Sequence, residues 1–216
     1  MESKDIEHTE RLHEYVEERA FGRDETLRRV EEATAGLGGI AIMQTSAAQA
    51  ALLELLVKVG GARHALEVGT FTGYGAIRIA RGLPDDGTLL CLELDENWAA
   101  TAQANIEEAG LARKVEIRVG PALAALQSLP AEPAFDFAYL DADTEGYPDY
   151  YEEIVPRLHP GGLLGVDNVL KSGQVIDPDN DAAVAVARLN DRVADDVRVE
   201  SVLLPLSDGL TLARRK

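Results

Sequence analysis

The sequence is short of cysteine, of basic residues and of long apolar runs, and each shortage excludes a class of protein. It has one cysteine, Cys91, so no disulfide can form within the chain. Cys91 lies in the apolar run Thr88–Leu94, which is typical of a buried strand. No apolar run approaches the roughly 20 residues of a membrane-spanning helix, and the first five residues lack the pattern of a signal peptide. We therefore expect a cytoplasmic protein that does not enter a membrane.

The balance of charge is strongly acidic. The chain has 21 Lys and Arg against 38 Asp and Glu, which gives a formal net charge of −17. Such a surface repels phosphate groups, and this argues against nucleic acid or an anionic membrane as a partner. The hydrophobic content of 46% is ordinary for a globular protein, and 216 residues suffice for one domain with a full core.

Strands and helices are expected to alternate after an N-terminal helical arm. Apolar residues recur at helical spacing within residues 5–36, and a glycine-rich break separates this arm (1–40) from the rest of the single domain (41–216). Strands are expected at Ala65–Val68, Thr88–Leu94, Val115–Val119, Phe135–Leu140, Leu163–Val166, Val197–Leu204 and Gly209–Ala213. Helices are expected after Thr45 or Ser46 as N-cap, from Ala76, and at Asn97–Ala109, Tyr150–Leu158 and Asp181–Ala194. The pattern predicts an α/β fold with a mostly parallel sheet and an antiparallel C-terminal hairpin.

The chain is organised around residues 64–75, where a short apolar strand meets a turn crowded with glycine. Gly69, Gly73 and Gly75 follow that strand, and helical periodicity resumes after them. A strand, a glycine turn and a helix in this order let the backbone pass close to a nucleotide-like ligand. The glycines alone are equally typical of a tight turn that binds nothing.

Two acidic residues distinguish between nucleotide ligands for this turn. The glycine spacing is G-x-x-x-G-x-G, which differs from the G-x-G-x-x-G of dinucleotide-binding folds. Glu67, two residues before Gly69, would repel a pyrophosphate and suits a cationic ligand such as S-adenosylmethionine. Glu93, at the end of the second strand and 24 residues after Gly69, is placed to accept hydrogen bonds from ribose hydroxyls.

The segment Leu66–Tyr74 resembles the first motif of class I S-adenosylmethionine-dependent methyltransferases. More narrowly, it resembles the cation-dependent O-methyltransferases of the catechol and caffeoyl-coenzyme A type. The likeness runs from Met43 to the C-terminus and includes four further motifs: Met43-Gln44-x-Ser46, Asp141-Ala142-Asp143, Asp167-Asn168-Val169 and residues 204–212. The resemblance implies a Rossmann-like fold with a seven-stranded sheet, helices on both faces, and a homodimer.

The resemblance also implies a set of cofactor-binding residues. Gly120-Pro121-Ala122 matches the family's segment against the adenine. The full set is Gln44, Glu67, Gly69, Thr70, Gly73, Tyr74, Gly75, Glu93, Gly120, Pro121, Ala122 and Asp141. Trp98 favours core packing, and the four histidines lack metal-ligand spacing, so we expect structural roles for them.

Asp141 and the pair Asp167-Asn168 follow the fourth and fifth strands. These strands are neighbours in the methyltransferase sheet, so their ends converge on one rim of the crevice. Two carboxylates and an amide oxygen favour Mg²⁺, with Ca²⁺ or Mn²⁺ as alternatives, and do not suit zinc. The simpler interpretation of these acids is that they cap strand ends.

A bound divalent ion would lower the pKa of two vicinal hydroxyls, and one of them would attack the sulfonium methyl group. Members of the family usually carry a lysine, thought to be the general base, three residues after the first metal-binding aspartate. Thr144 occupies that position here, and a threonine hydroxyl is a poor base near neutral pH. Lys171 is our candidate substitute, and Asp141, Thr144 and Lys171 form the candidate catalytic group. Alternatively the metal suffices, or the catalyst is weak.

The leading hypothesis is an O-methyltransferase that uses S-adenosylmethionine and Mg²⁺ on a small hydroxylated aromatic molecule, of the catechol or hydroxycinnamoyl type. A second hypothesis is methylation of a hydroxylated tRNA uridine, which the acidic charge opposes. A third is a cofactor-binding protein that has lost turnover, suggested by Thr144. Specificity is expected in the Lys171–Asn180 loop, the arm and the region after Asp143.

Overall fold

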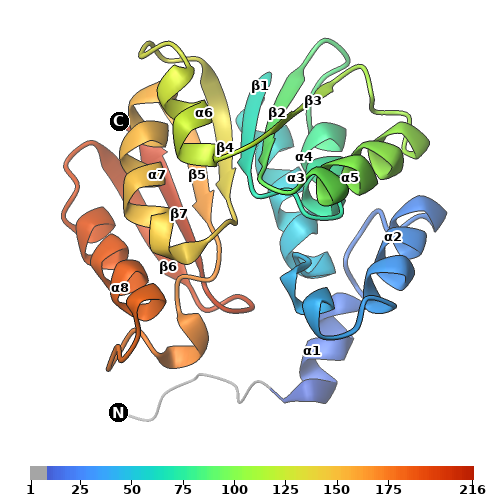
Figure 1. Ribbon diagram of the computed structural model, residues 1–216, viewed down its shortest axis with the longest axis horizontal. Coiled ribbons are helices and arrows are strands. Elements are labelled where there is room, and N and C mark those ends of the chain that lie inside the picture. Colours follow the sequence, from blue (N-terminus) through green and yellow to red (C-terminus); the bar gives the residue numbers. More distant parts are fainter. Residues whose placement is uncertain (1–8) are drawn as a thin grey trace.

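The computed structural model describes residues 9–216, which form one seven-stranded sheet between two layers of helices (Figure 1). The strand order is β3-β2-β1-β4-β5-β7-β6. The strands are β1 His64–Val68, β2 Thr88–Glu93, β3 Val115–Val119, β4 Phe135–Leu140, β5 Leu158–Val166, β6 Val199–Leu204 and β7 Leu210–Arg215. The pairs among β1 to β5 are parallel, and β7 runs antiparallel to both β5 and β6. The predicted α/β sheet with an antiparallel C-terminal hairpin is confirmed.

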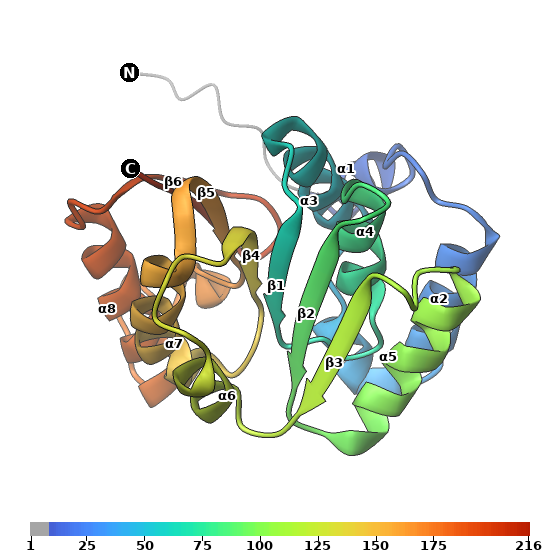
Figure 2. The same cartoon turned by 90° about the horizontal axis from the view of Figure 1, so that it is seen from above.

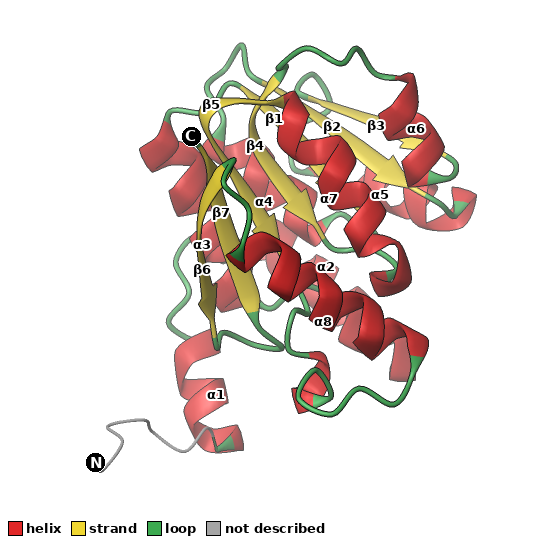
Figure 3. Ribbon diagram, turned by 90° about the vertical axis from the view of Figure 1, so that its left-hand side faces the viewer, coloured by secondary structure: helices red, strands yellow, loops and turns green. Residues whose placement is uncertain are grey.

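The helices divide between the two faces of this sheet, as the views in Figures 2 and 3 show. The α-helices are α1 Glu10–Glu17, α2 Glu25–Ala35, α3 Ala47–Gly60, α4 Tyr74–Gly82, α5 Glu96–Glu108, α6 Ala122–Ser128, α7 Tyr147–Ile154 and α8 Asp181–Ala194. Short 3₁₀ turns lie at Gly38–Met43, Thr144–Gly146, Val155–Arg157 and Lys171–Gly173. Residues from α2 to α5 pack on one face, and residues from α6 to α8 pack on the other.

Alternate residues of each central strand serve the two cores. Ala65 of β1 lies in the core under α3 and α4, whereas Leu66 and Val68 lie in the core under α7. Successive side chains of a strand point to opposite faces, so a strand covered on both sides must be apolar throughout. This is why the central strands appear in the sequence as continuous apolar runs without alternation.

Helix α3 is the most apolar helix of the described chain. The segment Gly38–Gly60, 23 residues long, is long and apolar enough to cross a membrane by length and composition, contrary to our expectation from the sequence. Within the segment, the backbone is extended at Gln44 and Ser46, and Ser46 then caps α3 by accepting a hydrogen bond from Gln49 N at 3.3 Å. Because Leu53 and Val57 pack into the core against α4, α3 is a buried helix of the domain.

The helical arm is attached to this domain by buried polar contacts. Arg78 of α4 is fully buried, pairs with Glu54 Oε2 at 2.8 Å and donates to the carbonyl oxygen of Phe21 at 2.6 Å. Removing one partner of a buried ion pair leaves an unpaired charge and costs several kcal/mol, about 3–5. The junction between α1 and α2 is therefore fixed to α4.

The fifth strand differs from the predicted one. We expected a helix up to Leu158 and a break at residues 159–162, whereas α7 ends at Ile154 and β5 already begins at Leu158. Leu158 pairs with Phe135, and the register shifts before the next pair, so Pro160 and Gly161 lie in an irregularity of the strand. The proline and glycines mark a bulge here, and local sequence does not distinguish a bulge from a turn.

Gly69 is required by backbone packing. Its φ is +88°, and a Cβ there would lie 1.8 Å from the carbonyl oxygen of Asp141 at the end of β4. Gly110, after α5, has φ +74° but no atom within 4 Å of its Cβ position. We expect Gly110→Ala to lower the free energy of unfolding by about 1–2 kcal/mol through backbone strain, and Gly69→Ala by clearly more than that because a backbone clash is added.

Urea unfolding of the two variants beside the wild type measures this difference. Equal losses in the two variants would show that the β1 and β4 ends can separate without cost, which contradicts the packing described.

Candidate active site

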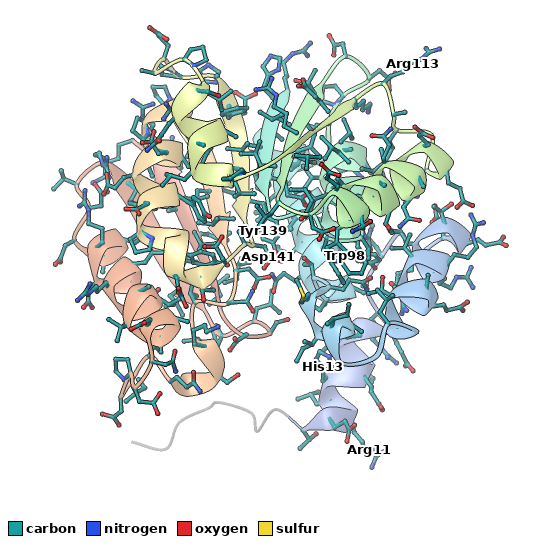
Figure 4. The ribbon with its side chains drawn as sticks, viewed as in Figure 1. Arg11, His13, Trp98, Arg113, Tyr139 and Asp141 are labelled. Carbon is teal, nitrogen blue, oxygen red and sulfur yellow. The ribbon has the colours of Figure 1, made fainter. Side chains whose placement is uncertain are left out.

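A cavity of about 1360 Å³ lies along the carboxyl ends of β1, β2, β4 and β5. Its walls come from the glycine turn, the start of α3, the start of α5, the loops after β4 and β5, and α1. Figure 4 shows Asp141 and Trp98 near the centre of the molecule and His13, from α1, toward the arm. Ligands of open α/β sheets bind in this place, outside the carboxyl ends of the strands.

Glu93 fixes the shape of the glycine turn. Its Oε2 accepts hydrogen bonds from the amides of Thr70 at 3.0 Å and Phe71 at 2.8 Å, and its Oε1 accepts one from Asp95 N at 3.0 Å. Phe71 has φ +49°, a left-handed conformation that these bonds help to hold. Glu93 lines the cavity, as expected, but the sequence did not reveal that its carboxylate also binds the turn itself.

Glu67 is a buried carboxyl group at the cavity wall. It is 1% exposed, and the thiol of Cys91 donates to its Oε2 at 3.4 Å. Burial raises the pKa of Glu67 to about 8 because the charged form is desolvated. No Lys or Arg pairs with it among residues 9–216, so its ionised form lacks a protein counter-ion there. A cationic ligand in the cavity would supply one.

Most of the predicted cofactor-binding residues line this one cavity. They are Gln44, Glu67, Gly69, Thr70, Tyr74, Gly75, Glu93, Pro121, Ala122 and Asp141. Gly73 and Gly120 are not among the lining residues, and a Cβ at Gly73 would lie 3.1 Å from Ala102 of α5. Three lining side chains have buried polar atoms without a partner in the described structure, Gln44 Oε1, Gln49 Oε1 and Thr70 Oγ1. Such atoms are available to a polar ligand.

Residues of the helical arm also form hydrogen bonds with the glycine turn and the start of α4. The Tyr74 hydroxyl donates to Glu31 Oε1 at 2.5 Å, and Arg23 binds the same carboxylate with its Nε at 3.2 Å. Nearby, Thr34 Oγ1 donates to Thr72 Oγ1 at 3.2 Å in a buried contact. Helix α2 therefore supports the wall of the cavity, although its charged residues resemble a solvated surface in the sequence.

Asp141, Asp167 and Asn168 come together on the opposite wall. Asn168 Nδ2 donates to Asp141 Oδ1 at 3.0 Å, and Asn168 N donates to Asp167 Oδ1 at 2.7 Å. Asn168 has φ +56°, a conformation that asparagine tolerates better than most residues. All three line the cavity, as the ends of neighbouring parallel strands should.

A buried network behind this wall escaped the sequence analysis. The Tyr139 hydroxyl donates to Asp167 Oδ2 at 2.6 Å and accepts from Gln49 Nε2 at 2.9 Å. Thr45 Oγ1 lies 3.3 Å from Tyr139 Oη and donates to Asp141 Oδ2 at 3.3 Å. Tyr139 looked like an ordinary strand residue, but a buried tyrosine hydroxyl needs a partner, and that requirement was the available signal.

The two carboxylates lie in an environment that opposes their charge. Burial raises the pKa of both, and the charge of Asp167 raises the pKa of Asp141 further. Among residues 9–216, neither forms an ion pair with Lys, Arg or His, and no group of three or more His, Cys, Asp or Glu side chains could hold a metal ion. A cation at this wall would therefore depend on the mixed set of two carboxylates and one amide oxygen, which are hard ligands.

The remaining candidates lie on the side of the same cavity that is formed by the loops after β4 and β5 and by the turn between β6 and β7. We call this part of the lining the acceptor side. Lys171 and Thr144 both line it, from the loops after β5 and β4. Asp143, which we expected not to be a ligand, accepts a hydrogen bond from the Tyr150 hydroxyl at 2.6 Å. His13 also lines the cavity, although we expected all four histidines to be structural. His64 and His159 do make structural contacts, with Thr88 and Asp136, and His8 lies outside the described residues.

Comparison with known proteins identifies the class. The family model described as O-methyltransferase matches residues 17–216. Caffeoyl-CoA O-methyltransferase 2 of Zea mays is 39% identical over 187 residues, which cover 81% of this chain and 70% of that protein. The crystal structure of the O-methyltransferase TomG from Streptomyces achromogenes in complex with SAM has a TM-score of 0.87 and 32% identity, and covers 95% of this chain and 96% of that one. An O-methyltransferase from Bacillus cereus in complex with SAH has a TM-score of 0.87 and 34% identity, over 95% and 97%.

Fold and cavity thus define a Rossmann-like methyltransferase. The chain belongs to the O-methyltransferase family, and the resemblance noted in its motifs is confirmed. It is an S-adenosylmethionine-dependent O-methyltransferase of the caffeoyl-CoA O-methyltransferase type.

The raised pKa of Glu67 generates a prediction about pH. In the unfolded chain this carboxyl has an ordinary pKa near 4.5, and in the folded protein it has a pKa of about 8. Between these values the folded state binds more protons, so its contribution to the free energy of unfolding falls as pH rises through this window. Glu67→Gln removes that loss, and we expect the variant to gain stability relative to the wild type between pH 5.5 and 8.5.

Urea unfolding at the two pH values measures the effect, with Glu132→Gln on an exposed loop as the control. Because a sulfonium favours the ionised carboxylate, S-adenosylmethionine affinity should rise with pH in the wild type and less so in Glu67→Gln. Parallel pH profiles for all three proteins would contradict the assignment of a buried, protonated Glu67.

Proposed function

We propose that this O-methyltransferase uses a divalent metal ion to methylate one of two vicinal hydroxyls on a small aromatic acceptor. The observation that carries the proposal is the wall formed by Asp141, Asp167 and Asn168. Asp167 is buried and Asp141 is half-buried, both line the cavity next to the Asn168 amide, and neither has a cationic partner among residues 9–216. Such an arrangement is costly unless a cation joins it.

The residues present fit Mg²⁺ or a similar hard cation. Asp141, Asp167 and Asn168 would hold the ion through oxygen atoms alone, and a set of three protein ligands would leave room for the acceptor hydroxyls. When bound, the ion supplies Lewis acidity, which lowers the pKa of the acceptor hydroxyls. Tyr139 and the amide of Asn168 hold the two oxygens of Asp167, so the carboxylate is oriented before any ligand arrives.

The glycine-turn side would bind and orient the methyl donor. Glu67 lines the cavity, where it can offset the positive charge of a sulfonium. Glu93 also lines the cavity, and its carboxylate accepts hydrogen bonds that hold the conformation of the turn. Phe71 and Trp98 pack edge to face with ring centroids 4.7 Å apart, and both line the cavity, so they form an apolar wall for the cofactor. Holding donor and acceptor in line supplies much of the rate in such a transfer.

Proton removal from the acceptor is assigned to Lys171, in place of the lysine that Thr144 replaces. Lys171 lies on the same cavity, with a left-handed φ of +47°, and Thr144 lies on the neighbouring loop. We also expect a homodimer in the cytoplasm. Methylation of tRNA and loss of turnover are the two alternatives considered from the sequence, and no contact in the cavity favours either.

Removal of the metal should abolish activity on a catechol. We expect EDTA to eliminate turnover and Mg²⁺ to restore it. Asp141→Asn and Asp167→Asn should lower kcat/KM by at least about 100-fold and weaken the binding of Mn²⁺. The electron paramagnetic resonance signal of Mn²⁺ measures that binding. Tyr139→Phe should weaken Mn²⁺ binding less, because it releases one oxygen of Asp167 without removing a ligand.

Asp85→Asn is the matched control, since Asp85 lies on the exposed turn before β2, at the other end of the sheet. Full activity in EDTA together with unchanged Mn²⁺ binding in Asp141→Asn would refute the metal site.

The candidate base generates a separate prediction. Lys171→Ala should lower kcat by about 100-fold or more and displace the acidic, ascending limb of the pH profile, because that limb reports deprotonation of the general base. Lys171→Arg keeps the charge but cannot accept a proton at neutral pH, so it should not rescue the rate. If Thr144→Lys raises kcat while Lys171→Ala has no effect, Lys171 is not the base.

A further inference from the structure

The acceptor side of the cavity is rich in negative charge and poor in positive charge. Asp141, Asp143, Asp167 and Asp208 all line it, from the loops that follow β4 and β5 and the turn between β6 and β7. Among the described residues, Lys171 is the one lysine of the lining, and no arginine contributes to it. Of the described residues, an acceptor entering from this side therefore meets several carboxylates and one lysine ammonium group.

A smaller cavity of about 460 Å³ continues past the acceptor side. It lies between α1 and the β6–β7 turn, and it shares His13 and Ser207 with the main cavity. Its other described residues include Glu10 and the apolar Leu170 and Pro205, and no lysine or arginine is among them. A long acceptor tail that followed this path would encounter one more carboxylate and, among residues 9–216, no lysine or arginine.

One observation that does not involve the acids indicates a ligand in the main cavity. Thr70 is 5% exposed, its Oγ1 has no partner in the described structure, and it lines the main cavity. The relative from Streptomyces achromogenes holds SAM in its crystal structure. We therefore interpret the charge of the acceptor side as a determinant of which methyl acceptors bind.

An acyl-coenzyme A acceptor conflicts with this distribution of charge. Its diphosphate and phosphomonoester bring roughly four negative charges, and proteins bind such groups with arginine, lysine and clustered backbone amides. A divalent ion would offset the charges of Asp141 and Asp167 but not those of Asp143 and Asp208, which line the same side of the cavity. Phosphates near this rim would face repulsion with one lysine to compensate.

We propose that the acceptor is a free catechol whose side chain is uncharged or cationic, and that coenzyme A thioesters are excluded, although the curated relatives are caffeoyl-CoA O-methyltransferases. The inference rests on the proposed function of this cavity. Asp208 is the residue best placed to interact with the side chain of the catechol acceptor. One of its oxygens accepts a hydrogen bond from Ser172 N at 2.6 Å, and the other has no partner among residues 9–216.

Four acceptors that share a catechol ring test the proposal on the full chain with Mg²⁺ and S-adenosylmethionine. They are 3,4-dihydroxyphenethylamine, the corresponding alcohol, 3,4-dihydroxyphenylacetate and caffeoyl-coenzyme A, which differ in side-chain charge. We expect kcat/KM to fall in that order, with the amine at least about 10-fold above the carboxylate at low salt and the difference shrinking at high salt. The thioester should be the poorest acceptor.

Asp208→Asn keeps an oxygen for Ser172 N and removes the charge. We expect it to raise kcat/KM for the carboxylate acceptor relative to the alcohol by about 3- to 10-fold, as loss of one nearby charge allows. Asp85→Asn changes the net charge equally at the far end of the sheet and should leave the ratio unchanged.

Calorimetric binding of the same four compounds to the SAH-loaded protein reads the preference without turnover. Turnover of none, with the expected order of binding, would reject the proposed reaction and retain the charge selection. Caffeoyl-coenzyme A or the carboxylate binding or reacting at least as well as the alcohol would overturn the inference, as would identical effects of Asp208→Asn and Asp85→Asn.

Discussion

The active site depends on one close approach of backbones, where the end of β1 meets the end of β4. Gly69 has no side chain, and a Cβ there would collide with the carbonyl oxygen of Asp141. This contact places the turn that would bind the cofactor directly against Asp141, the first of the proposed metal ligands. The hydrogen bond from Asp141 N to Val68 O at 2.8 Å continues the sheet to the same point. Donor and acceptor chemistry are therefore brought together by main-chain geometry, before any side chain is considered.

Buried polar groups then orient what the backbone has brought together. At the proposed metal site, Tyr139 and Thr45 link Asp167 and Asp141 to the start of α3. On the cofactor side, Glu31 holds the Tyr74 hydroxyl. Each contact joins an element that is distant in the chain to the cavity wall. A substitution in α2 or α3 can therefore alter the site without changing a residue that would contact a ligand, because it removes a hydrogen-bond partner that orients a side chain of the cavity wall.

The sequence predicted the element types well where local rules decide them. Apolar runs gave the central strands because both faces of the sheet are covered, and Ser46 capped α3 as its position suggested. The motifs were specific enough to identify the family and to predict that Asp141, Asp167 and Asn168 lie on one wall of the cavity. Sequence reasoning failed where long-range partners decide. The bulge in β5 depends on pairing with β4, and the contacts of Tyr139, Glu93 and Gly69 that shape the site are with groups 22 to 94 residues away.

The single cysteine has a consequence for how the protein can be observed. Cys91 is fully buried in β2, and burial together with the neighbouring Glu67 raises the pKa of its thiol well above the usual value. A thiol in that state does not react with alkylating reagents until β1 and β2 part. The rate at which Cys91 is labelled therefore reports the opening of the central sheet beside the cofactor turn. A bound methyl donor that stabilises the closed sheet would register as slower labelling, so the native chain carries its own reporter of cofactor occupancy.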